Sequence, residues 1–427
     1  MKPSFVFILA DDLGYADLGC YGGRTPCSPN LDRMASQGLR FTDGYANSPV
    51  CSPTRFALAT GRWQYRLRGG ADEPIASRAR GSAVLGLPPE HPTLASLLRD
   101  AGYATALIGK WHLGFAPKFG PLKSGYQEFF GPLAGGVDYF SHCDTAGVHD
   151  LFDGNREVHL TGYLTDLLSG KAVEFVKRQA RKPFLLSLHY TAPHWPWETR
   201  EDEAESQRIG TRIAHLDGGS VQTYLTMIRQ MDEGIGRVLA ALDDIGAAED
   251  TVVVFTSDNG GERFSDSWPL KGGKMDLLEG GIRVPYIARW PARLPAGRTT
   301  DRLAITMDWV PTSLNAAGVA PHRDYPMDGV DLLAVESERN LYWRMKFRNQ
   351  QAVRSGAWKY LSIEGQEFLF DLSKDLRERA NLKSREPERF ETLKEDYARW
   401  EATLPAIPVD AKVSLVYGDA EMARPSS

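Results

Sequence analysis

The sequence contains little cysteine and no long apolar run. Its 427 residues include only four cysteines, Cys20, Cys27, Cys51 and Cys143, which are too few for a disulfide framework in a chain of this length. A single bridge between Cys20 and Cys27 is compatible with their spacing but is not required. No segment reaches the roughly 20 consecutive apolar residues of a membrane-spanning helix, so no membrane span is expected.

The sequence also has no strong excess of charge of either sign. The 50 Lys and Arg residues against 55 Asp and Glu give a formal net charge of −5, so no nucleic acid partner is expected. With 42% hydrophobic and 25% charged residues, the composition is that of an ordinary globular protein and excludes a disordered or collagenous chain. The length allows two or three domains and a large core.

The first apolar run, residues 5–10, is too short for an export signal and ends at two aspartates. As written, the chain is therefore expected in the cytoplasm. A periplasmic or secreted location is expected instead if a native signal was replaced by the starting Met1.

Short apolar runs alternate with amphipathic helical patterns, which favours βα units and a mostly parallel sheet. Buried strands are expected at residues 5–10, 104–108, 184–190 and 251–256. Amphipathic helices are expected from Ser28 to Gly38, over residues 94–101 and 164–176, and over residues 228–242 with Gly246 beyond the last turn.

The pattern changes after about residue 325. Short alternating or aromatic strands are expected at residues 352–353, 358–363 and 368–372, followed by a charged helix that ends near Thr403. We therefore predict an α/β domain over residues 1–325, with helices on both faces of a large, mixed, mostly parallel sheet. A small C-terminal α+β domain on an antiparallel sheet, with a terminal helix and tail, is predicted over residues 326–427. Residues 200–219 are rich in charged residues and glycine and are predicted to be a solvated insertion rather than a core element.

Polar residues follow each of the four expected strands. They are Asp11 and Asp12, Lys110 and His112, His194, and Asp258 and Asn259. Ligands of open α/β sheets bind at the carboxyl ends of the strands, so these groups are expected to converge on one pocket. Carboxylate and amide oxygens suit Ca²⁺ or Mg²⁺, and the lysine and histidines suit an anionic substrate. Each motif alone also fits an ordinary turn or helix cap, and the set does not separate a phosphatase from a sulfatase.

Cys51 makes that distinction. A free cysteine is most often a small buried hydrophobe, but Cys51 stands among Ser and Pro residues just before Arg55 and an expected helix. With Pro53 and Arg55 it forms a C-x-P-x-R core that resembles the type I sulfatases of the alkaline phosphatase superfamily. Ala59 departs mildly from the large apolar residue usual there. In that family a dedicated formylglycine-generating enzyme oxidises the cysteine to formylglycine, whose hydrate is the nucleophile.

Further family blocks follow in the usual order. They are residues 102–112, Ala192-Pro193-His194, residues 257–261 and 273–285, and, in the tail, residues 352–360 and 369–372. Residues 138–142 resemble a loop that reaches the sulfate in arylsulfatases and N-acetylgalactosamine-4-sulfatases. That likeness implies that Ser141 or His142 binds substrate, although a solvated loop histidine fits the residues equally well.

The resemblance implies a sulfuric ester hydrolase of the arylsulfatase type. Asp11, Asp12, Asp258, Asn259 and the modified Cys51 would hold Ca²⁺, with Mg²⁺ as the alternative. Arg55 would pair with the formylglycine hydrate, and Lys110 and Lys274 would neutralise sulfate oxygens. His194 is the candidate acid for the leaving alcohol. His112 is the candidate base for the second hydroxyl, whose deprotonation expels sulfate; the division of these two roles stays open.

Two other functions remain as alternatives. One is a phosphate or phosphonate monoester hydrolase of the same superfamily, although Thr or Ser in place of Cys51 would have supported a phosphatase. The other is an inactive sulfatase-like binding protein, which the intact set of polar residues argues against.

The expected partner is a sulfated small molecule or saccharide, with a carbohydrate sulfate favoured and aryl sulfates possible. Specificity is expected from the loops at residues 66–87, 117–153 and 200–219. Trp195, Trp197 and Trp268 are expected either to stack on a ring of the substrate or to pack these loops. Lys271 is a lesser candidate beside Lys274, and the sequence leaves the oligomeric state open.

Overall fold

The structure is a computed structural model that describes residues 2–179, 182–213, 218–334 and 338–415. Its main feature is a ten-stranded sheet with the order β11-β2-β10-β9-β1-β8-β4-β5-β6-β7. The strands are β1 (Ser4–Ala10), β2 (Leu39–Phe41), β4 (Ala104–Gly109), β5 (Glu128–Gly131), β6 (Phe152–Asp153), β7 (Arg156–Glu157), β8 (Phe184–His189), β9 (Thr251–Ser257), β10 (Tyr286–Arg289) and β11 (Arg298–Thr300).

The five central strands β9, β1, β8, β4 and β5 run parallel to one another. Strand β10 is antiparallel to β9 and β2, and β6 and β7 form an antiparallel extension at the other edge. Every residue of β1, β8 and β9 is buried, as expected for strands covered on both faces. The predicted large, mixed, mostly parallel sheet is therefore confirmed.

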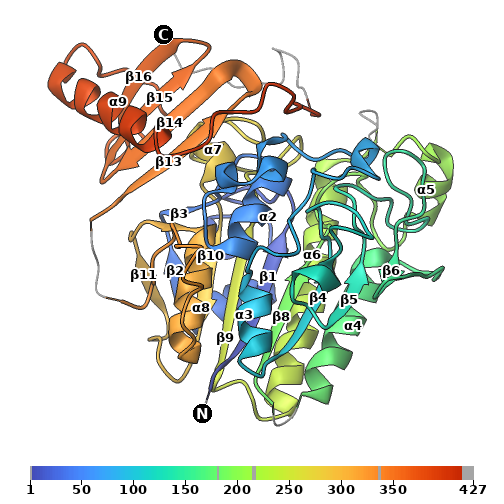
Figure 1. Cartoon of the computed structure of the whole chain (residues 1–427). Helices are drawn as coiled ribbons and strands as arrows, with labels where there is room; N and C mark the ends of the chain where they lie inside the picture. Colours follow the sequence, from blue (N-terminus) through green and yellow to red (C-terminus); the bar gives the residue numbers. More distant parts are fainter. Residues whose placement is uncertain (1, 180–181, 214–217, 335–337, 416–427) are drawn as a thin grey trace.

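Helices cover both faces of this sheet (Figure 1). One group is α1 (Pro29–Ser36), α4 (Leu164–Arg178) and α6 (Val221–Asp244), and the other is α2 (Cys51–Thr60), α3 (Leu94–Asp100) and α8 (Trp309–Ala317). The four predicted helices are α1, α3, α4 and α6. Helix α3 begins with a capping box in which Thr93 and Ser96 exchange side-chain-to-backbone hydrogen bonds.

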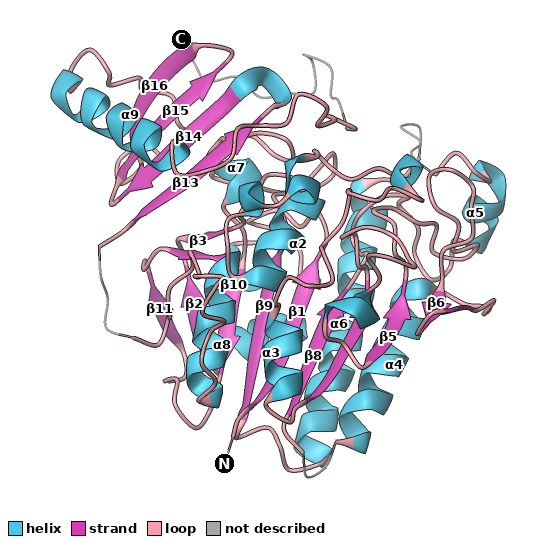
Figure 2. Cartoon of the chain, in the orientation of Figure 1, coloured by secondary structure: helices cyan, strands magenta, loops and turns pink. Residues whose placement is uncertain are grey.

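A second, four-stranded antiparallel sheet lies in the C-terminal part (Figure 2). It consists of β13 (Asn340–Met345), β14 (Gln350–Ser355), β15 (Trp358–Ile363) and β16 (Gln366–Asp371), and α9 (Pro387–Glu401) packs against β14 and β15. This antiparallel sheet and terminal helix were predicted, but β13 was missed. The domain boundary at residue 326 stays a prediction, and the tail at 416–427 lies outside the described residues.

The smaller elements connect the two parts. Strands β3 (Gly44–Tyr45) and β12 (Ala304–Ile305) form a two-stranded sheet, and α7 (Glu279–Ile282) is a single turn. A second hydrophobic core joins residues of the C-terminal sheet, such as Trp343 and Leu361, to Val50, Cys51 and Met275. The C-terminal sheet thus packs directly behind the segment that carries Cys51.

Two predictions need correction or completion. Residues 200–219 are not only a solvated insertion, because they include α5 (Glu203–Ile209), where Ser206 and Ile209 are buried. The hydroxyl of Ser206 donates to Asp138 Oδ1 at 2.7 Å, which anchors this helix to a loop near the candidate site. Residues 214–217 of the same prediction lie outside the described residues. All four cysteines are free thiols, so the optional Cys20–Cys27 bridge is not formed.

Within the described part of the chain, no helix has the length and apolar character needed to cross a membrane.

Candidate active site

The polar residues predicted at the strand ends come together at the carboxyl edge of the sheet. Asp11 and Asp12 follow β1, Lys110 and His112 follow β4, His194 follows β8, and Asp258 and Asn259 follow β9. Helix α2 contributes Cys51 and Arg55 from its first two turns. Gly109, at the end of β4, has a φ of +115°, and a Cβ there would lie 1.8 Å from the carbonyl oxygen of His189. Only glycine allows the backbone to turn there and bring Lys110 into the site.

Asp12 lies at one centre of this arrangement. Its Oδ1 accepts from Asn259 Nδ2 and its Oδ2 from Lys274 Nζ, each at 2.7 Å. The Nε2 of His194 is 3.6 Å from Asp12 Oδ2. Burial alone would raise the pKa of Asp12, but the charge of Lys274 and the hydrogen bonds from Lys274 and Asn259 hold that pKa well below its ordinary value. Asp12 is therefore a carboxylate, and it holds Lys274 within the cluster.

Asp11 and Asp258 form the second centre, with Arg55 and Lys110. Arg55 contacts Asp258 Oδ2 through Nε at 2.9 Å and Nη2 at 2.8 Å, and its Nη1 donates to the carbonyl of Lys110 at 3.0 Å. Lys110 Nζ lies 2.5 Å from Asp11 Oδ2. Burial, followed by the charge of Asp11, raises the pKa of Asp258 to about 7. Burial and, after it, the crowding of carboxylates disfavour the charged form of Asp258, and a bound cation would favour that form.

The donor atoms of this cluster fit a hard divalent cation. Asp11 Oδ1 and Asn259 Oδ1 are buried and have no hydrogen-bond partner among the described residues. Buried polar atoms normally have a partner, so two unpaired oxygens in one cluster point to a ligand. Ligand atoms of Asp11, Cys51 and Asp258 also lie within 4.8 Å of one another. Oxygen donors of this kind suit Ca²⁺ or Mg²⁺.

A cavity of about 100 Å³ opens beside this cluster. Four predicted catalytic residues line it, namely Cys51, His112, His194 and Lys274. Its wall also contains residues 74–77, Gly135, Gly136, Thr145 and Trp195, and Ser414 and Leu415 from the C-terminal tail. A larger groove of about 1200 Å³ between the C-terminal sheet and residues 301–303 shares no lining residue with this cavity and contains none of the predicted site residues. The predicted catalytic residues therefore gather at the smaller cavity.

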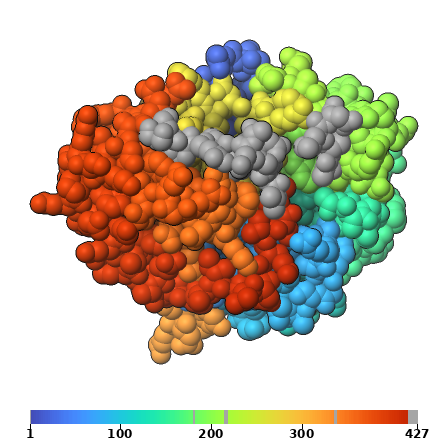
Figure 3. Space-filling view, turned by 90° about the horizontal axis from the view of Figure 1, so that it is seen from above, coloured from blue at the N-terminus to red at the C-terminus, as the bar shows by residue number. Residues whose placement is uncertain are grey.

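The tail residues were missed in the sequence. Val413 forms a parallel bridge with Glu73. The backbone N–H of Glu73 donates to the carbonyl of Lys412, and the backbone N–H of Ser414 donates to the carbonyl of Glu73, both at 2.8 Å. Viewed from above, the C-terminal part (orange to red) lies against the blue N-terminal segments (Figure 3). Nothing in the local sequence pattern of residues 411–415 indicates this pairing, because more than 300 residues of chain separate the two segments.

The two histidines of the cavity are held by backbone carbonyls. His112 Nε2 is 2.7 Å from the carbonyl of Ile75, and its Nδ1 is buried with no partner in the part of the chain that the structure describes. His194 Nδ1 is 2.6 Å from the carbonyl of Trp195. Burial, followed by the charge of Lys110 for His112 and of Lys274 for His194, lowers both pKa values, to about 3 for His194. Both rings are therefore neutral, and each carries its proton on the nitrogen that faces the carbonyl.

Other predicted residues lie outside the cavity wall. Ser141 is exposed, and His142 Nε2 is 3.2 Å from the carbonyl of Gly162. Thr145, from the same loop, does line the cavity, and its hydroxyl lies 3.0 Å from that of Ser77. Substrate binding by Ser141 or His142 therefore stays a prediction, and Thr145 is the loop residue that sequence reasoning missed.

The three tryptophans have different environments. Trp195 lines the cavity, and its ring centroid is 4.2 Å from that of His194. Trp197 is buried and packs edge-on against Phe264. Trp268 is 58% exposed and lies under the guanidinium of Arg377. Lys271 is half-buried and is not part of the cavity wall. Only Trp195 is therefore placed to contact a molecule in the cavity.

Comparison with known proteins identifies the family. The family model described as Sulfatase matches residues 3–319. The chain belongs to the sulfatase family. The matched range includes the polar residues at the strand ends, the carboxylate cluster and Cys51 at the start of α2.

Individual relatives agree with this assignment. The chain is 36% identical to N-acetylgalactosamine-6-sulfatase of Canis lupus familiaris over 354 residues, which cover 78% of this chain and 65% of that protein. It is 29% identical to human steryl-sulfatase, covering 95% of this chain and 89% of the relative. The solved structure of Ps i-CgsB in complex with k-i-k-neocarrahexaose superimposes with a TM-score of 0.85 at 30% identity, covering 95% of this chain and 94% of that one.

Proposed function

We propose that this protein hydrolyses sulfate monoesters, with a sulfated carbohydrate as the favoured substrate. The observation that carries the proposal is the position of Cys51, which lies in the wall of the cavity with Lys274, His112 and His194. A sulfate group in that cavity would face cationic lysine and neutral histidine side chains. These groups can bind an anionic ester and move protons.

The unmodified thiol of Cys51 is poorly suited to attack sulfur. Burial raises its pKa to about 11, so the thiol is neutral at physiological pH. We therefore propose that a formylglycine-generating enzyme converts Cys51 to formylglycine during maturation, as the family resemblance implies. The hydrated aldehyde would supply a hydroxyl nucleophile at the same position.

A divalent cation is proposed for the carboxylate cluster, Ca²⁺ first and Mg²⁺ as the alternative. Asp11, Asp12, Asp258 and Asn259, together with the residue at position 51, would hold it. When bound, such an ion supplies Lewis-acid stabilisation of developing negative charge.

The remaining residues position the reacting groups. Arg55 stands one turn after Cys51 on α2 and is fixed by Asp258, so it orients the residue at position 51. Lys274 and Lys110 neutralise sulfate oxygens, and their contribution grows as charge builds on those oxygens in the transition state. His112 has a free Nδ1 lone pair in the cavity wall, which suits the proposed base. His194 must gain a proton before it can donate one to the leaving alcohol, and a bound anion favours that protonation.

A carbohydrate substrate fits the polar part of the wall. Thr145, Ser77 and Ser414 bring hydroxyl groups that can pair with sugar hydroxyls, and Trp195 offers a ring face. One relative is named N-acetylgalactosamine-6-sulfatase, and the superimposed structure is a complex with a neocarrahexaose. A small aryl sulfate would also fit.

The proposal is tested by comparing an aryl sulfate, a sulfated monosaccharide and an aryl phosphate with enzyme produced together with a formylglycine-generating enzyme. Intact mass spectrometry first checks the modification, which removes about 18 Da from Cys51. We expect sulfate esters to be cleaved fastest and the Cys51→Ala variant to be inactive. Faster cleavage of the phosphate would favour the phosphohydrolase alternative. An inactive protein with modified Cys51 would favour the binding-protein alternative, and full activity without modification would refute the nucleophile.

A further inference from the structure

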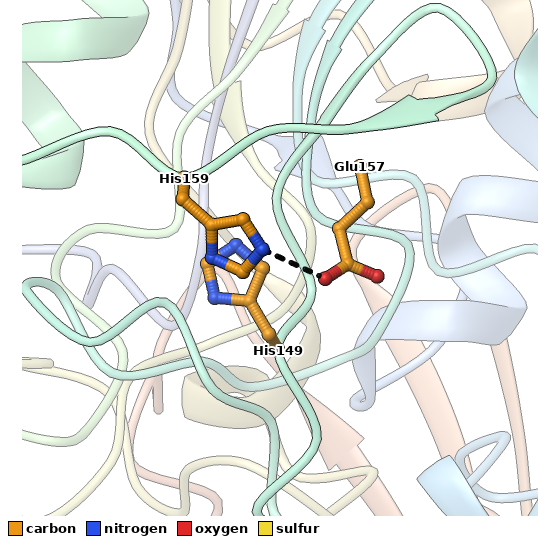
Figure 4. A group of neighbouring side chains, drawn as sticks. All are labelled: His149, Glu157 and His159. Atoms are coloured by element: carbon orange, nitrogen blue, oxygen red, sulfur yellow. Dashed lines mark ion pairs between the residues drawn. The ribbon is translucent and has the colours of Figure 1, made fainter.

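A second cluster of potential metal ligands lies outside the cavity, at the edge formed by β6 and β7. One ligand atom each from His149, Glu157 and His159 lies within 4.8 Å of the others. His159 Nε2 is 3.2 Å from Glu157 Oε1, and the two imidazole rings face each other with centroids 4.2 Å apart (Figure 4). None of the three residues lines the candidate active site.

The surroundings of His149 suggest that a cation belongs there. Its Nδ1 lies 3.2 Å from the carbonyl oxygen of Ser141, and its Nε2 lies 3.0 Å from that of Val158. A neutral imidazole carries only one N–H, so one of these nitrogens directs a lone pair at a carbonyl oxygen. That contact is unfavourable, and rotation of the ring would free this nitrogen to bind a metal ion instead. Glu157 adds a negative charge at the same place.

We propose that His149, His159 and Glu157 form a binding site for a transition-metal ion of the zinc class. Two imidazoles and a carboxylate are typical zinc ligands, and water can complete the coordination. Ca²⁺ prefers oxygen donors, so this site is chemically distinct from the carboxylate cluster at Asp11. The side chain of His159 is 73% exposed and can turn out of the ring stack to direct a nitrogen at the ion.

The site would act on the loop that borders the cavity. Residues 141–149 run from Ser141 past Thr145, which lines the cavity, to His149, and Cys143 and His149 form an antiparallel bridge at the base of this loop. Glu157 ends β7 and His159 follows it, so an ion bound by all three residues would tie the loop base to the sheet edge. This arrangement would stiffen one wall of the cavity.

The test is calorimetric titration of the full chain with Zn²⁺ in the presence of saturating Ca²⁺. His159→Ala is the main variant, because that ring makes no hydrogen bond to the backbone of the described residues. His149→Gln is a second variant, and His322→Ala is the matched control, since His322 is an exposed histidine elsewhere. Zn²⁺ bound by Cys51 or His194 would be common to all four proteins.

We expect wild type and His322→Ala to bind one more Zn²⁺ ion per chain than the two other variants. The affinity loss should exceed the 10–100-fold typical when a ligand loses a hydrogen-bond partner. Co²⁺ gives a second readout, because its visible absorption reports nitrogen ligands, and the band assigned to this site should vanish in His159→Ala. Equal Zn²⁺ stoichiometry and affinity in wild type and His159→Ala would overturn the proposal.

Discussion

Arg55 and Asp258 form a completely buried ion pair, with Nε and Nη2 of the arginine 2.9 and 2.8 Å from the same carboxylate oxygen. Arg55 lies on α2, four residues after Cys51, so both side chains are on one face of the helix. Asp258 lies just beyond β9. The pair therefore fixes the start of α2 over the carboxyl end of the sheet, and with it the position of the proposed nucleophile.

Removing this arginine should affect both stability and activity. Arg55→Ala leaves Asp258 buried and unpaired, so we expect a loss of about 3–5 kcal/mol in the free energy of unfolding. We also expect kcat/KM for a sulfate ester to fall by about 100-fold or more. Denaturant titration and steady-state kinetics measure the two effects. Arg24→Ala, which removes an arginine that is 82% exposed, is the matched control and should change neither. Unchanged activity in folded Arg55→Ala would exclude the positioning role.

Lys274 should matter far more than its neighbour Lys271. Lys274 contacts Asp12 and lines the cavity, whereas Lys271 lies outside its wall. Loss of a cation that stabilises charge in the transition state costs about 100- to 1,000-fold in kcat. We expect that loss for Lys274→Ala and less than a twofold effect for Lys271→Ala, both measured with one aryl sulfate. Similar rates for the two variants would contradict the assignment of Lys274 to the sulfate.

Chelation should destabilise the protein as well as inactivate it. Three buried carboxylates share the proposed cation site, and removal of the ion leaves their repulsion uncompensated. A ligand present at 100 times its Kd stabilises the folded state by about 2.7 kcal/mol. We therefore expect EDTA to lower Tm by several degrees and readdition of Ca²⁺ to restore Tm and activity together. In Asp11→Asn the effect of EDTA on Tm should be smaller. A Tm insensitive to EDTA in the wild type would argue against a bound ion.

The C-terminal tail should influence substrate binding. Ser414 lines a cavity of only about 100 Å³ and is held there by the hydrogen bond that its backbone N–H donates to the carbonyl of Glu73. In Ser414→Tyr the larger side chain competes with substrate for this space, so KM for a sulfated saccharide should rise at least tenfold while kcat changes less. The control is Ser384→Tyr, which places the same ring on an exposed surface. If both variants have the KM of the wild type, the tail does not form part of the substrate site.

Glu198 should make stability fall as the pH rises. Burial, followed by the neighbouring charge of Asp138, raises the pKa of Glu198 to about 9. The folded state therefore keeps this proton up to higher pH than the unfolded chain, whose glutamate titrates near 4.5. The stabilising contribution is complete below pH 4.5 and is lost as the pH rises through 9, at up to about 1.4 kcal/mol per pH unit.

Glu198→Gln should remove that dependence, because an amide does not titrate. We expect little change in stability at pH 5 and a variant more stable than the wild type at pH 9, measured by urea unfolding. Glu201→Gln alters a neighbouring carboxylate whose carbon chain has the same length and is the control. Parallel stability curves for wild type and Glu198→Gln would show that Glu198 is already ionised in the folded state.

The local sequence pattern was sufficient to predict much of the fold and of the candidate site. Short continuous apolar runs identified the central strands, because these strands are covered on both faces. A period of 3.6 residues identified the helices that cover them, because burial of one helix face imposes that period on the sequence. The polar residues directly after β1, β4, β8 and β9 could be grouped into one site, since parallel strands end at the same edge of a sheet. Cys51, Pro53 and Arg55 indicated the chemistry because their spacing is itself the family motif.

Tertiary structure alone decided the rest. The pairing of Val413 with Glu73, which brings Ser414 to the cavity, joins segments far apart in the chain and leaves no local period. The buried side of α5 depends on Asp138, and the missed strand β13 is defined by its partner β14. The protonated nitrogens of His112 and His194 are set by carbonyls of Ile75 and Trp195. The sequence thus identified one of its four cysteines, Cys51, as a proposed catalytic residue, but only the folded chain shows what surrounds it.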